Sequence, residues 1–488
     1  MFPRFGGRRR ALAGCLALFC AVLSACAPAA RASLAGAGGQ TSGGGWGGSF
    51  APAVPAASVS LSAAQPAAPT ASAAPSAQPA APACASPAPT FSPACAAPPD
   101  ALAPTASPAP AASPSPSAAL ACRAVWFSYL DWRPGDFASA AAFSARAAAV
   151  CGAAAGLGAN TLLLQVRPFC DALYPSRLFP FSHLCTGAQG VDPGFDPLGL
   201  FVAAAHAAGL RLVAWVNPYR VSSGQTPAAL AGSSPAVQHP DWVKTTSEGR
   251  YLDPASPAVR AYIAQGLDEL CGAYAVDGVQ FDDYFYPDPS PGFDAAQYAA
   301  YAAAAAAPLS LAGWRRQNVS ALVSLCWQTV HRHPGVSFTV SPQGDPDAGL
   351  ATQYADAAGW LAAPGYVDGL VPQLYWGLGW RQKGSDRLAA GTLARRWLAL
   401  PRAAGVTLCF GLAASRIGGA DGRDATSPAP AEWRSGRALA DAAALLAGLG
   451  ADGVAIYRYG SLFENPDFPA LAGQEENNLA QKWSAAQF

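Results

Sequence analysis

The sequence has few charged residues, and neither sign is clustered. Only 12% of the 488 residues are charged, the 30 basic residues balance the 30 acidic ones, and the formal net charge is zero. Lysine occurs only at Lys244, Lys383 and Lys482, and the arginines form no basic stripe. Nucleic acids are bound through clustered positive charge, so this composition argues against a nucleic-acid partner.

Histidine is also scarce, which bears on metal binding. Apart from His331 and His333 the histidines are scattered, and the sequence contains no Cys-x-x-Cys pair or larger cluster of His and Cys. Protein zinc sites are built from such closely spaced ligands. We therefore expect neither a metal nor another cofactor.

Long apolar runs are absent except at the N-terminus. Arg4 and Arg8–Arg10 precede an apolar stretch over Ala11–Ala25, which is followed by Cys26. This order predicts an export signal over residues 1–26. Its end, Leu-Ser-Ala-Cys, resembles the bacterial lipobox, in which the cysteine is lipidated and becomes the first mature residue. We expect an exported protein anchored through Cys26 to the extracytoplasmic face of a bacterial membrane; an ordinary secretory signal or a single membrane anchor is the alternative.

Residues 27–119 contain very few aromatic or charged residues. They consist almost entirely of Ala, Pro, Ser, Gly and Thr. Such a segment buries too little apolar surface to offset the entropy of ordering, so we expect a disordered linker. A linker behind a lipid anchor would extend the reach of a folded domain.

The cysteine count is incompatible with complete pairing. After removal of the signal and lipidation of Cys26, nine of the 12 cysteines remain, which is an odd number. Cys170 and Cys185 flank one loop and are the best candidates for a disulfide. Three others fall in helical or strand patterns and are expected to pack as small apolar residues: Cys271, Cys326 and Cys409.

Eight short segments rich in β-branched and aromatic residues alternate with Ala-rich helical stretches over residues 120–473. This alternation predicts βα units, and eight such units close a parallel (β/α)8 TIM barrel, with residues 474–488 as a C-terminal tail. An open doubly wound sheet is disfavoured because no Gly-rich phosphate loop follows the first segment. The segments begin at Arg123, Asn160, Leu210, Asp277, Val336, Val367, Gly405 and Asp452.

The fourth segment ends in the sequence VDGVQFDDYFYP, over Val276–Pro287. Side chains alternate along a strand, so Val279 and Phe281 should face the helices while Gln280 and Asp282 point into the barrel. The side chain of Asp283 should then face the surrounding helices or lie in the turn that follows the strand. The C-terminal ends of barrel strands, which we call the barrel mouth, carry the chemistry of barrel enzymes.

The same alternation brings further polar and aromatic side chains to the barrel mouth. Amides, hydroxyls, an arginine and aromatic rings are typical of a sugar site, because they bind hydroxyl groups and the apolar faces of sugar rings. The residues expected there are Gln165, Arg167, Trp215, Asn217, Gln373, Tyr375, Trp376, Trp380, Tyr457 and Tyr459.

Five sequence blocks resemble the glycosyl hydrolase family 10-like group, formerly known as domain of unknown function 187. They are GANTLLLQVRPFCDALYPS, RLVAWVNPYR, VDGVQFDDYFYP, WRRQNV and VDGLVPQLYW, in that order. The resemblance implies a (β/α)8 barrel in an exported or lipid-anchored bacterial protein. It also implies hydrolysis of envelope glycans, including peptidoglycan strands stripped of their stem peptides. The fourth segment also resembles the DGFRxD strand of the α-amylase superfamily, with Gln280 in place of Arg and Asp282 at the nucleophile position.

Glycoside hydrolysis usually requires two carboxyl groups. We expect Asp282 to be the nucleophile or base. Asp283 and Asp171 are equally favoured as the acid, ahead of Asp345 and Glu464. Tyr284 and Tyr286 could form an aromatic pocket that raises the pKa of an acid. Among the remaining residues of these segments, Arg167, Asn217 and Tyr219 are expected to position substrate, and Arg220 to hold the loop after the third segment.

Two other functions remain open at this point. A metal-dependent polysaccharide deacetylase would use an Asp pair such as that in FDD, but His331 and His333 precede the fifth segment, at the opposite end of the barrel. A non-catalytic glycan-binding lipoprotein is the other alternative, because a fold does not guarantee activity. In each case the expected partner is a polysaccharide or other glycan.

Overall fold

The computed structural model describes residues 121–224, 226–419 and 429–485. The predicted signal peptide, Cys26 and the predicted linker lie outside these residues. The described part of the chain starts at the first predicted strand and contains all eight predicted strand segments.

Eight parallel strand positions close into a barrel, which confirms the predicted (β/α)8 fold. The strands follow one another around the barrel in chain order, and β11 returns to pair with β9. The sixth position is split into β9 and β10, because Pro372 between them has no N–H to donate. The strands are β1 (Cys122–Phe127), β2 (Thr161–Arg167), β3 (Arg211–Val216), β7 (Gly278–Phe281), β8 (Ser337–Val340), β9 (Gly369–Leu370), β10 (Gln373–Leu374), β11 (Thr407–Ala413) and β12 (Gly453–Tyr457).

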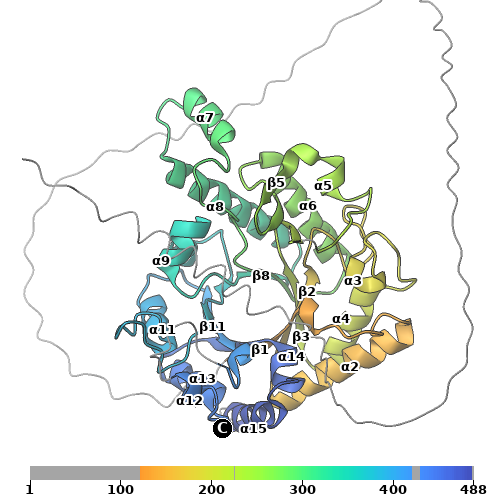
Figure 1. Cartoon of the computed structure of the whole chain (residues 1–488), viewed down its shortest axis with the longest axis vertical. Helices are drawn as coiled ribbons and strands as arrows, with labels where there is room; N and C mark the ends of the chain where they lie inside the picture. The colour runs from red at the N-terminus through yellow and green to blue at the C-terminus, as the bar shows by residue number, and fades with distance from the viewer. Residues whose placement is uncertain (1–120, 225, 420–428, 486–488) are drawn as a thin grey trace, which may run out of the picture. The chain divides into compact units, whose positions relative to one another are not determined.

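Helices follow the strands and surround the barrel, as Figure 1 shows. Each strand position is followed by at least one helix that returns the chain to the start of the next strand. The main helices are α2 (Ala140–Leu157), α4 (Pro197–Ala207), α6 (Pro257–Ala273), α8 (Leu311–Val330), α10 (Ala357–Ala362), α11 (Ala390–Leu398), α13 (Ala438–Gly448) and α15 (Pro469–Ala485). Short helices accompany them: α3 (His183–Thr186), α5 (Pro235–Gln238), α9 (Pro346–Ala348), α12 (Ala429–Glu432) and α14 (Tyr459–Phe463).

The strands divide the core into two layers. Alternate residues such as Val125, Phe127 and Val279 pack outward against the helices, where most of the buried apolar side chains lie. The opposite set fills the inside of the barrel: Ala124, Trp126, Leu163, Val213, Trp215, Val371, Cys409 and Ala455. The inside of the barrel is therefore filled by side chains, and those nearest the C-terminal ends of the strands lie directly beneath the barrel mouth.

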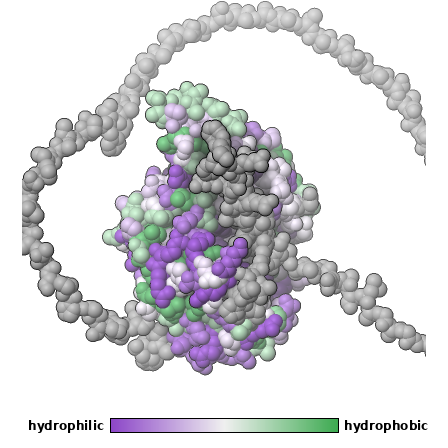
Figure 2. Space-filling model, turned by 60° about the vertical axis from the view of Figure 1, so that its left-hand side comes forward, coloured by the Kyte–Doolittle hydropathy of each residue, from purple (hydrophilic) through white to green (hydrophobic). Residues whose placement is uncertain are grey.

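Two long excursions rise from the strand ends. The chain after β3 forms a small antiparallel sheet of β4 (Arg220–Ser223), β5 (Val243–Thr246) and β6 (Gly249–Leu252). The chain after β7 carries α7 (Ala295–Ala304), which projects beyond α8 at the top of Figure 1. None of the residues of α7 is buried, and its alanines give this end the pale green surface visible in Figure 2.

The predicted disulfide between Cys170 and Cys185 is wrong. Both residues are buried free thiols, and burial raises the pKa of Cys170 to about 12. The loop between them is closed by its own backbone, since Ala172 donates to the carbonyl of Pro180 and accepts from the N–H of Ser182. Loop closure therefore needs no covalent link.

Within the described residues, α2 alone is long and apolar enough to cross a membrane. It packs instead against α4 and α15, and it buries Phe143, Val150 and Leu157. Its composition reflects its place in the helix layer of the barrel.

The expected C-terminal tail is part of the barrel's helix layer. The chain continues without interruption through α15 to Ala485, beyond the expected domain end at residue 473. Leu479 and Trp483 are buried, and Trp483 lies beneath Gly158. The carboxylate of Glu475 accepts from the first N–H groups of α13. The sequence pattern missed this helix because its surface is rich in polar residues.

Removal of the Trp483 ring tests the structural role of α15. We expect Trp483→Ala to lower the free energy of unfolding by about 3–5 kcal/mol, because a large buried side chain leaves a cavity. Urea denaturation of the purified protein measures the change. The exposed neighbour Lys482 provides the control Lys482→Ala, and a similar small effect for both variants would contradict the packing of α15.

Candidate active site

Asp282 lies immediately after β7, and its carboxylate is surrounded by hydrogen-bond donors. The indole Nε1 of Trp215 donates to Oδ2 over 2.9 Å, and Nδ2 of Asn217 lies 3.2 and 3.1 Å from the two carboxylate oxygens. The backbone N–H of Tyr284 donates to Oδ1 over 3.4 Å. Trp215 in β3 and Asn217 just after it thus hold the carboxylate that follows the adjacent β7 in one orientation.

The electrostatic environment of Asp282 favours its neutral form. Burial raises the pKa of Asp282 to about 7, and the nearby charge of Asp283 acts in the same direction. The positive charge of Arg220 and the hydrogen bonds from Trp215 and Tyr284 oppose this rise. A carboxyl group that titrates near neutrality can act in proton transfer at physiological pH.

Asp283 lies in the turn after β7, and its carboxylate is held by two amides. Nε2 of Gln373 donates to Oδ1 and Nε2 of Gln353 donates to Oδ2, each over 3.2 Å. Burial raises the pKa of Asp283, and these two hydrogen bonds oppose the rise. Because β7 ends at Phe281, Asp282 continues the alternation of the strand by one residue, whereas Asp283 lies in the turn and is not oriented by it.

Aromatic rings from four strand positions meet at the barrel mouth. Tyr375 stacks on Tyr457 with a centroid distance of 5.3 Å. Trp126 and Trp215 each meet Tyr457 edge-on, at 6.1 and 6.4 Å. Gln280 accepts a hydrogen bond from Nε1 of Trp126 through its amide oxygen and donates one to Thr339 through its amide nitrogen. Its side chain therefore links β1 to β8 inside the barrel.

Arg220 lies beside the two carboxylates in an aromatic surround. Its guanidinium carbon is 4.8 Å from the ring centroids of Phe169 and Tyr284 and 5.4 Å from that of Tyr129. Asn217 orients it, because Oδ1 of Asn217 accepts from the backbone N–H of Arg220 over 2.8 Å. The expected loop-holding role is present, since Nε donates to the carbonyl of Pro168, but the guanidinium also faces the site.

Arg167 and Tyr219 lie away from this group. A bulge between Gln165 and Arg167 shifts the register of β2 against β3, so Arg167 pairs with the position of Val216 and turns outward. Its guanidinium stacks on Phe179 at 3.8 Å. Tyr219 is fully buried in the helix-facing core. The expectation that these two side chains position substrate at the barrel mouth is wrong.

The other three acid candidates serve structural contacts. The carboxylate of Asp171 is fully buried and accepts from the N–H of Phe169 and from Gln189. Asp345 forms ion pairs with two arginines, Arg387 and Arg396. Burial raises the pKa of Glu464, but its hydrogen bonds and ion pairs with Arg146 and Arg133 outweigh this effect and lower it. These contacts leave Asp283 as the companion of Asp282.

The remaining expected residues lie around the same mouth with different exposures. Gln165 is buried and accepts from the N–H of Tyr129 over 3.1 Å, so it ties β2 to the loop after β1. Trp376 is half-buried and meets Trp380 edge-on at 6.4 Å. Tyr459, by contrast, packs outward on Phe127 because it belongs to α14 and not to β12.

A buried ion pair braces the loop that carries the carboxylates. Arg315 on α8 pairs with Asp294, and both side chains are fully buried. The same guanidinium donates to the carbonyls of Pro289 and Ser290 and to the hydroxyl of Tyr354. Tyr354 follows Gln353, so this brace supports both the chain after Asp283 and one of the amides that hold it.

The described residues contain no group of three His, Cys, Asp or Glu side chains that could hold a metal ion. His331 and His333 pair with Asp368 and Asp268, before β8 and away from Asp282. The ligand set that a metal-dependent deacetylase would require is therefore not assembled in this part of the chain.

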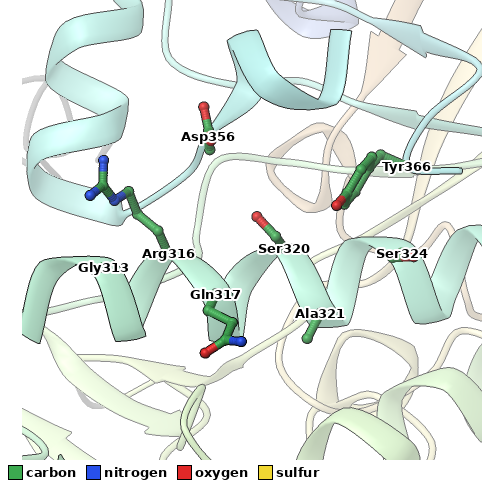
Figure 3. A pocket seen from close by; sticks show the side chains of 8 residues that line it. All are labelled: Gly313, Arg316, Gln317, Ser320, Ala321, Ser324, Asp356 and Tyr366. Carbon is green, nitrogen blue, oxygen red and sulfur yellow. The ribbon is translucent and has the colours of Figure 1, made fainter. Parts of the chain in front are cut away.

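A hollow of about 500 Å³ lies elsewhere, on the outer face of α8. Figure 3 shows its lining, in which the one carboxylate, Asp356, faces α8 from the start of α10. That carboxylate accepts from the N–H of Gly359 as the cap of α10. The lining residues are Gly313, Arg316, Gln317, Ser320, Ala321, Ser324, Asp356 and Tyr366, and none of them lies at the barrel mouth.

Sequence reasoning missed three residues of the site. Trp126 follows the inward phase of β1 and could have been found by the alternation that identified Trp215. Gln353 lies in an irregular turn after α9, and no sequence pattern predicts its contact with Asp283. Arg220 was assigned to the loop alone, because its position among three aromatic rings depends on the excursion after β3.

The barrel region of this chain is similar in sequence to proteins named as glycosyl hydrolases. The family model described as glycosyl hydrolase-like 10 matches residues 122–426. Glycosyl hydrolase DigH of Escherichia coli K12 is 36% identical over 288 residues, covering 54% of this chain and 64% of DigH. Glycosyl hydrolase YngK of Bacillus subtilis is 37% identical over 253 residues, covering 48% of this chain and 49% of YngK. The matches thus span 64% of DigH and 49% of YngK, less than two thirds of either relative.

Among solved structures, the glycoside hydrolase domain of PgaB (BpsB) from Bordetella bronchiseptica is similar over 72% of this chain and 98% of that domain. The TM-score is 0.47 and the sequence identity is 16%.

Burial of Asp282 predicts a pH-dependent cost in stability. A pKa raised from 3.8 to about 7 means that the folded state holds a proton that the unfolded state has lost, so stability falls as pH rises between about 4 and 7. Asp282→Asn removes this dependence. As the pH rises from about 4 to 7, the free energy of unfolding of the variant should increase relative to that of wild type by on the order of 3–4 kcal/mol. Urea denaturation at a series of pH values measures it, with the exposed Asp241→Asn as control; parallel curves for all three proteins would contradict the raised pKa.

Proposed function

This chain belongs to the glycosyl hydrolase-like 10 family, and from that premise we propose that it hydrolyses glycosidic bonds in a cell-envelope polysaccharide. The proposal rests chiefly on one observation. Two consecutive acids, Asp282 and Asp283, follow the end of β7 and interact electrostatically, at the end of the barrel where barrel enzymes hold their reacting groups. The rings and amides around them have the composition of a sugar site.

We assign Asp282 as the nucleophile or base. Its two oxygens face only donors, namely Trp215, Asn217 and the N–H of Tyr284; these contacts hold the group in one direction and oppose the rise in pKa that burial causes. Arg220 adds a nearby positive charge that stabilises the same ionised form. A carboxylate held in this way can attack the anomeric carbon directly or activate a water molecule.

Asp283 is assigned as the acid. It is more exposed than Asp282, and its amide partners Gln353 and Gln373 can turn an oxygen toward a neutral carboxyl group as readily as a nitrogen toward a charged one. The charge of Asp283 raises the pKa of Asp282, so the two acids do not titrate independently. The protonated member can then deliver its proton to the leaving glycosidic oxygen.

The aromatic rings supply the surface on which a sugar would lie. Tyr375 and Tyr457 are half-buried and stacked, so part of each ring remains open at the mouth. Such rings contact the apolar faces of pyranoses, while neighbouring amides bind hydroxyl groups. This arrangement orients a sugar above the carboxyl pair.

We further propose that the protein is exported and anchored through a lipid on Cys26. The support is the sequence of residues 1–26 and the composition of the segment that follows. An anchored hydrolase on a long linker would meet polymers close to the membrane, including peptidoglycan strands that have lost their peptides.

Hydrolysis itself can be tested directly. The purified protein is incubated with peptide-free peptidoglycan strands and with a panel of α- and β-glucans, and new reducing ends are measured. We expect wild type and Asp241→Asn to cleave one of these polymers and Asp282→Asn to be at least about 10³-fold slower. Equal product from wild type and Asp282→Asn would remove Asp282 from the mechanism. Failure to cleave any of these glycans would instead favour a glycan-binding protein.

The two carboxyl roles can be separated by the leaving group. An aryl glycoside with an acidic phenol leaves without protonation, so it does not need the general acid. We expect Asp283→Asn to lose about 10²-fold or more on the polymer and much less on the aryl glycoside, whereas Asp282→Asn loses activity on both. Kinetics with both substrates measure this, and equal losses for Asp283→Asn would contradict its role as the acid.

The carboxyl pair also predicts a pH profile. Hydrolysis requires an ionised Asp282 and a protonated Asp283, so kcat/KM should rise with pH as Asp282, whose pKa burial raises to about 7, loses its proton, and fall at higher pH as Asp283 loses its own. Measurement of kcat/KM across this range checks the profile. With Asp283→Asn on the aryl glycoside the alkaline fall should disappear, and its persistence would assign it to another group.

A further inference from the structure

We propose that Arg167 binds a small monovalent anion of the halide class, such as chloride, inside the helix layer of the barrel. The ion lies against the guanidinium of Arg167 and the hydroxyl of Tyr174, away from the barrel mouth. This inference is independent of the proposed hydrolase function, because it concerns how the wall of the barrel is stabilised.

Arg167 is a fully buried cation with unused hydrogen-bond donors. The residue is only 1% exposed, and α6 packs so closely on it that a Cβ at Gly266 would lie 2.6 Å from Nη1. Nε and Nη1 are buried and make no hydrogen bond to a described residue, and the same is true of the nearby hydroxyl of Tyr174. Phe179 covers one face of the guanidinium at 3.8 Å. A ring over the face accepts no hydrogen bond in the guanidinium plane, so the donors there can still bind a ligand.

Arg167 differs from the other buried arginines of the described chain, each of which has a carboxylate to balance its charge. Arg167 forms no ion pair with an Asp or Glu of the described residues. An arginine does not lose its proton, and a buried charge without a partner is costly, so the charge calls for an anion. The carboxylates elsewhere belong to Asp294 for Arg315, to Glu464 for Arg146 and, across the candidate active site, to Asp282 for Arg220.

The ionisable side chains that lie close enough to respond to the charge of Arg167 are themselves neutral. They are two thiols and two phenols, and burial raises the pKa of each one, that of Tyr174 to about 12. The carboxylate of Glu269 also acts on Tyr174, but it accepts instead from the hydroxyl of Ser176 and the backbone N–H of Arg177. The four neutral residues are Cys170, Tyr174, Tyr262 and Cys326.

The enclosure of Arg167 selects an ion that is small and singly charged. A sulfate or phosphate ion would bring two charges into the interior against one guanidinium, and the cost of burying a charge rises with its size. A halide balances the single charge and can accept from Arg167 and Tyr174 together. A water molecule could satisfy the same donors, but it would leave the charge unbalanced.

The position of Arg167 links the ion to the loop after β2. Arg167 is the last residue of β2, and the carbonyl of Pro168, which follows it, accepts from Nε of Arg220. An anion between the end of β2 and α6 therefore holds the start of this loop in place. We expect its removal to lower the stability of the folded protein.

A halide series tests the inference. The full-length protein is heated in sodium gluconate at constant ionic strength, with chloride or bromide replacing gluconate stepwise. We expect the Tm of wild type to rise by on the order of 3 °C and to approach saturation, because an ion that binds only the folded state stabilises it. Arg167→Met should lose this rise, and Arg332→Met, which removes an exposed arginine, should keep it. Equal halide responses of wild type and Arg167→Met overturn the proposal.

A second measurement needs no variant and decides the inference if Arg167→Met does not fold. Crystals of the wild-type protein are grown in sodium bromide, and anomalous diffraction is recorded at the bromine edge. We expect an anomalous peak in contact with the guanidinium of Arg167 and the hydroxyl of Tyr174. A map that shows only water at this position, or bromide only at the protein surface, overturns the proposal.

Discussion

The site depends on the burial of a single carboxylate at the end of a strand. Asp282 is only 4% exposed, and an uncompensated charge at such a position would be expensive. Donors on the neighbouring strand offset this cost: the indole of Trp215 and the amide of Asn217 both belong to the β3 end of the barrel. Their directions are fixed by the parallel register of β3 and β7, in which Trp215 lies opposite Gln280. The pairing of β3 with β7 in the closed barrel therefore determines the orientation of the Asp282 carboxylate.

Amide side chains also position the charged groups around Asp282. Asn217 uses its nitrogen for the carboxylate and its oxygen for the backbone of Arg220, so one amide sets the positions of an anion and a cation. Asp283 is held from the opposite side by Gln353 and Gln373, which belong to the chain after β8 and to β10. Elements separated by more than 150 residues thus converge on two adjacent acids. The fold supplies this convergence because all eight strands end at one mouth.

The fold followed from local patterns, whereas part of the site did not. Eight strands and the inward phase of Asp282 could be predicted, because strand composition and period-two alternation are local properties. Asp283 could not be oriented in this way, since the ladder ends before it. Arg167 was misplaced by a bulge that adds one residue to β2. The partners of Asp283 and the surroundings of Arg220 come from distant loops, whose paths the sequence does not encode in any short motif.

The bulge in β2 determines whether the positive charge of Arg167 faces the barrel mouth or the helix layer. Because it sends Arg167 to the helix layer, Arg220 is the cation that borders the carboxyl pair in the described chain. A homologous strand of the same length without this bulge would place Val166 opposite Val216, and the simple alternation would then turn Arg167 inward. Two homologous barrels could then carry the same arginine and present different numbers of positive charges to a sugar. Ligand preference in such barrels can therefore shift through the formation or loss of a single bulge, with every polar side chain retained.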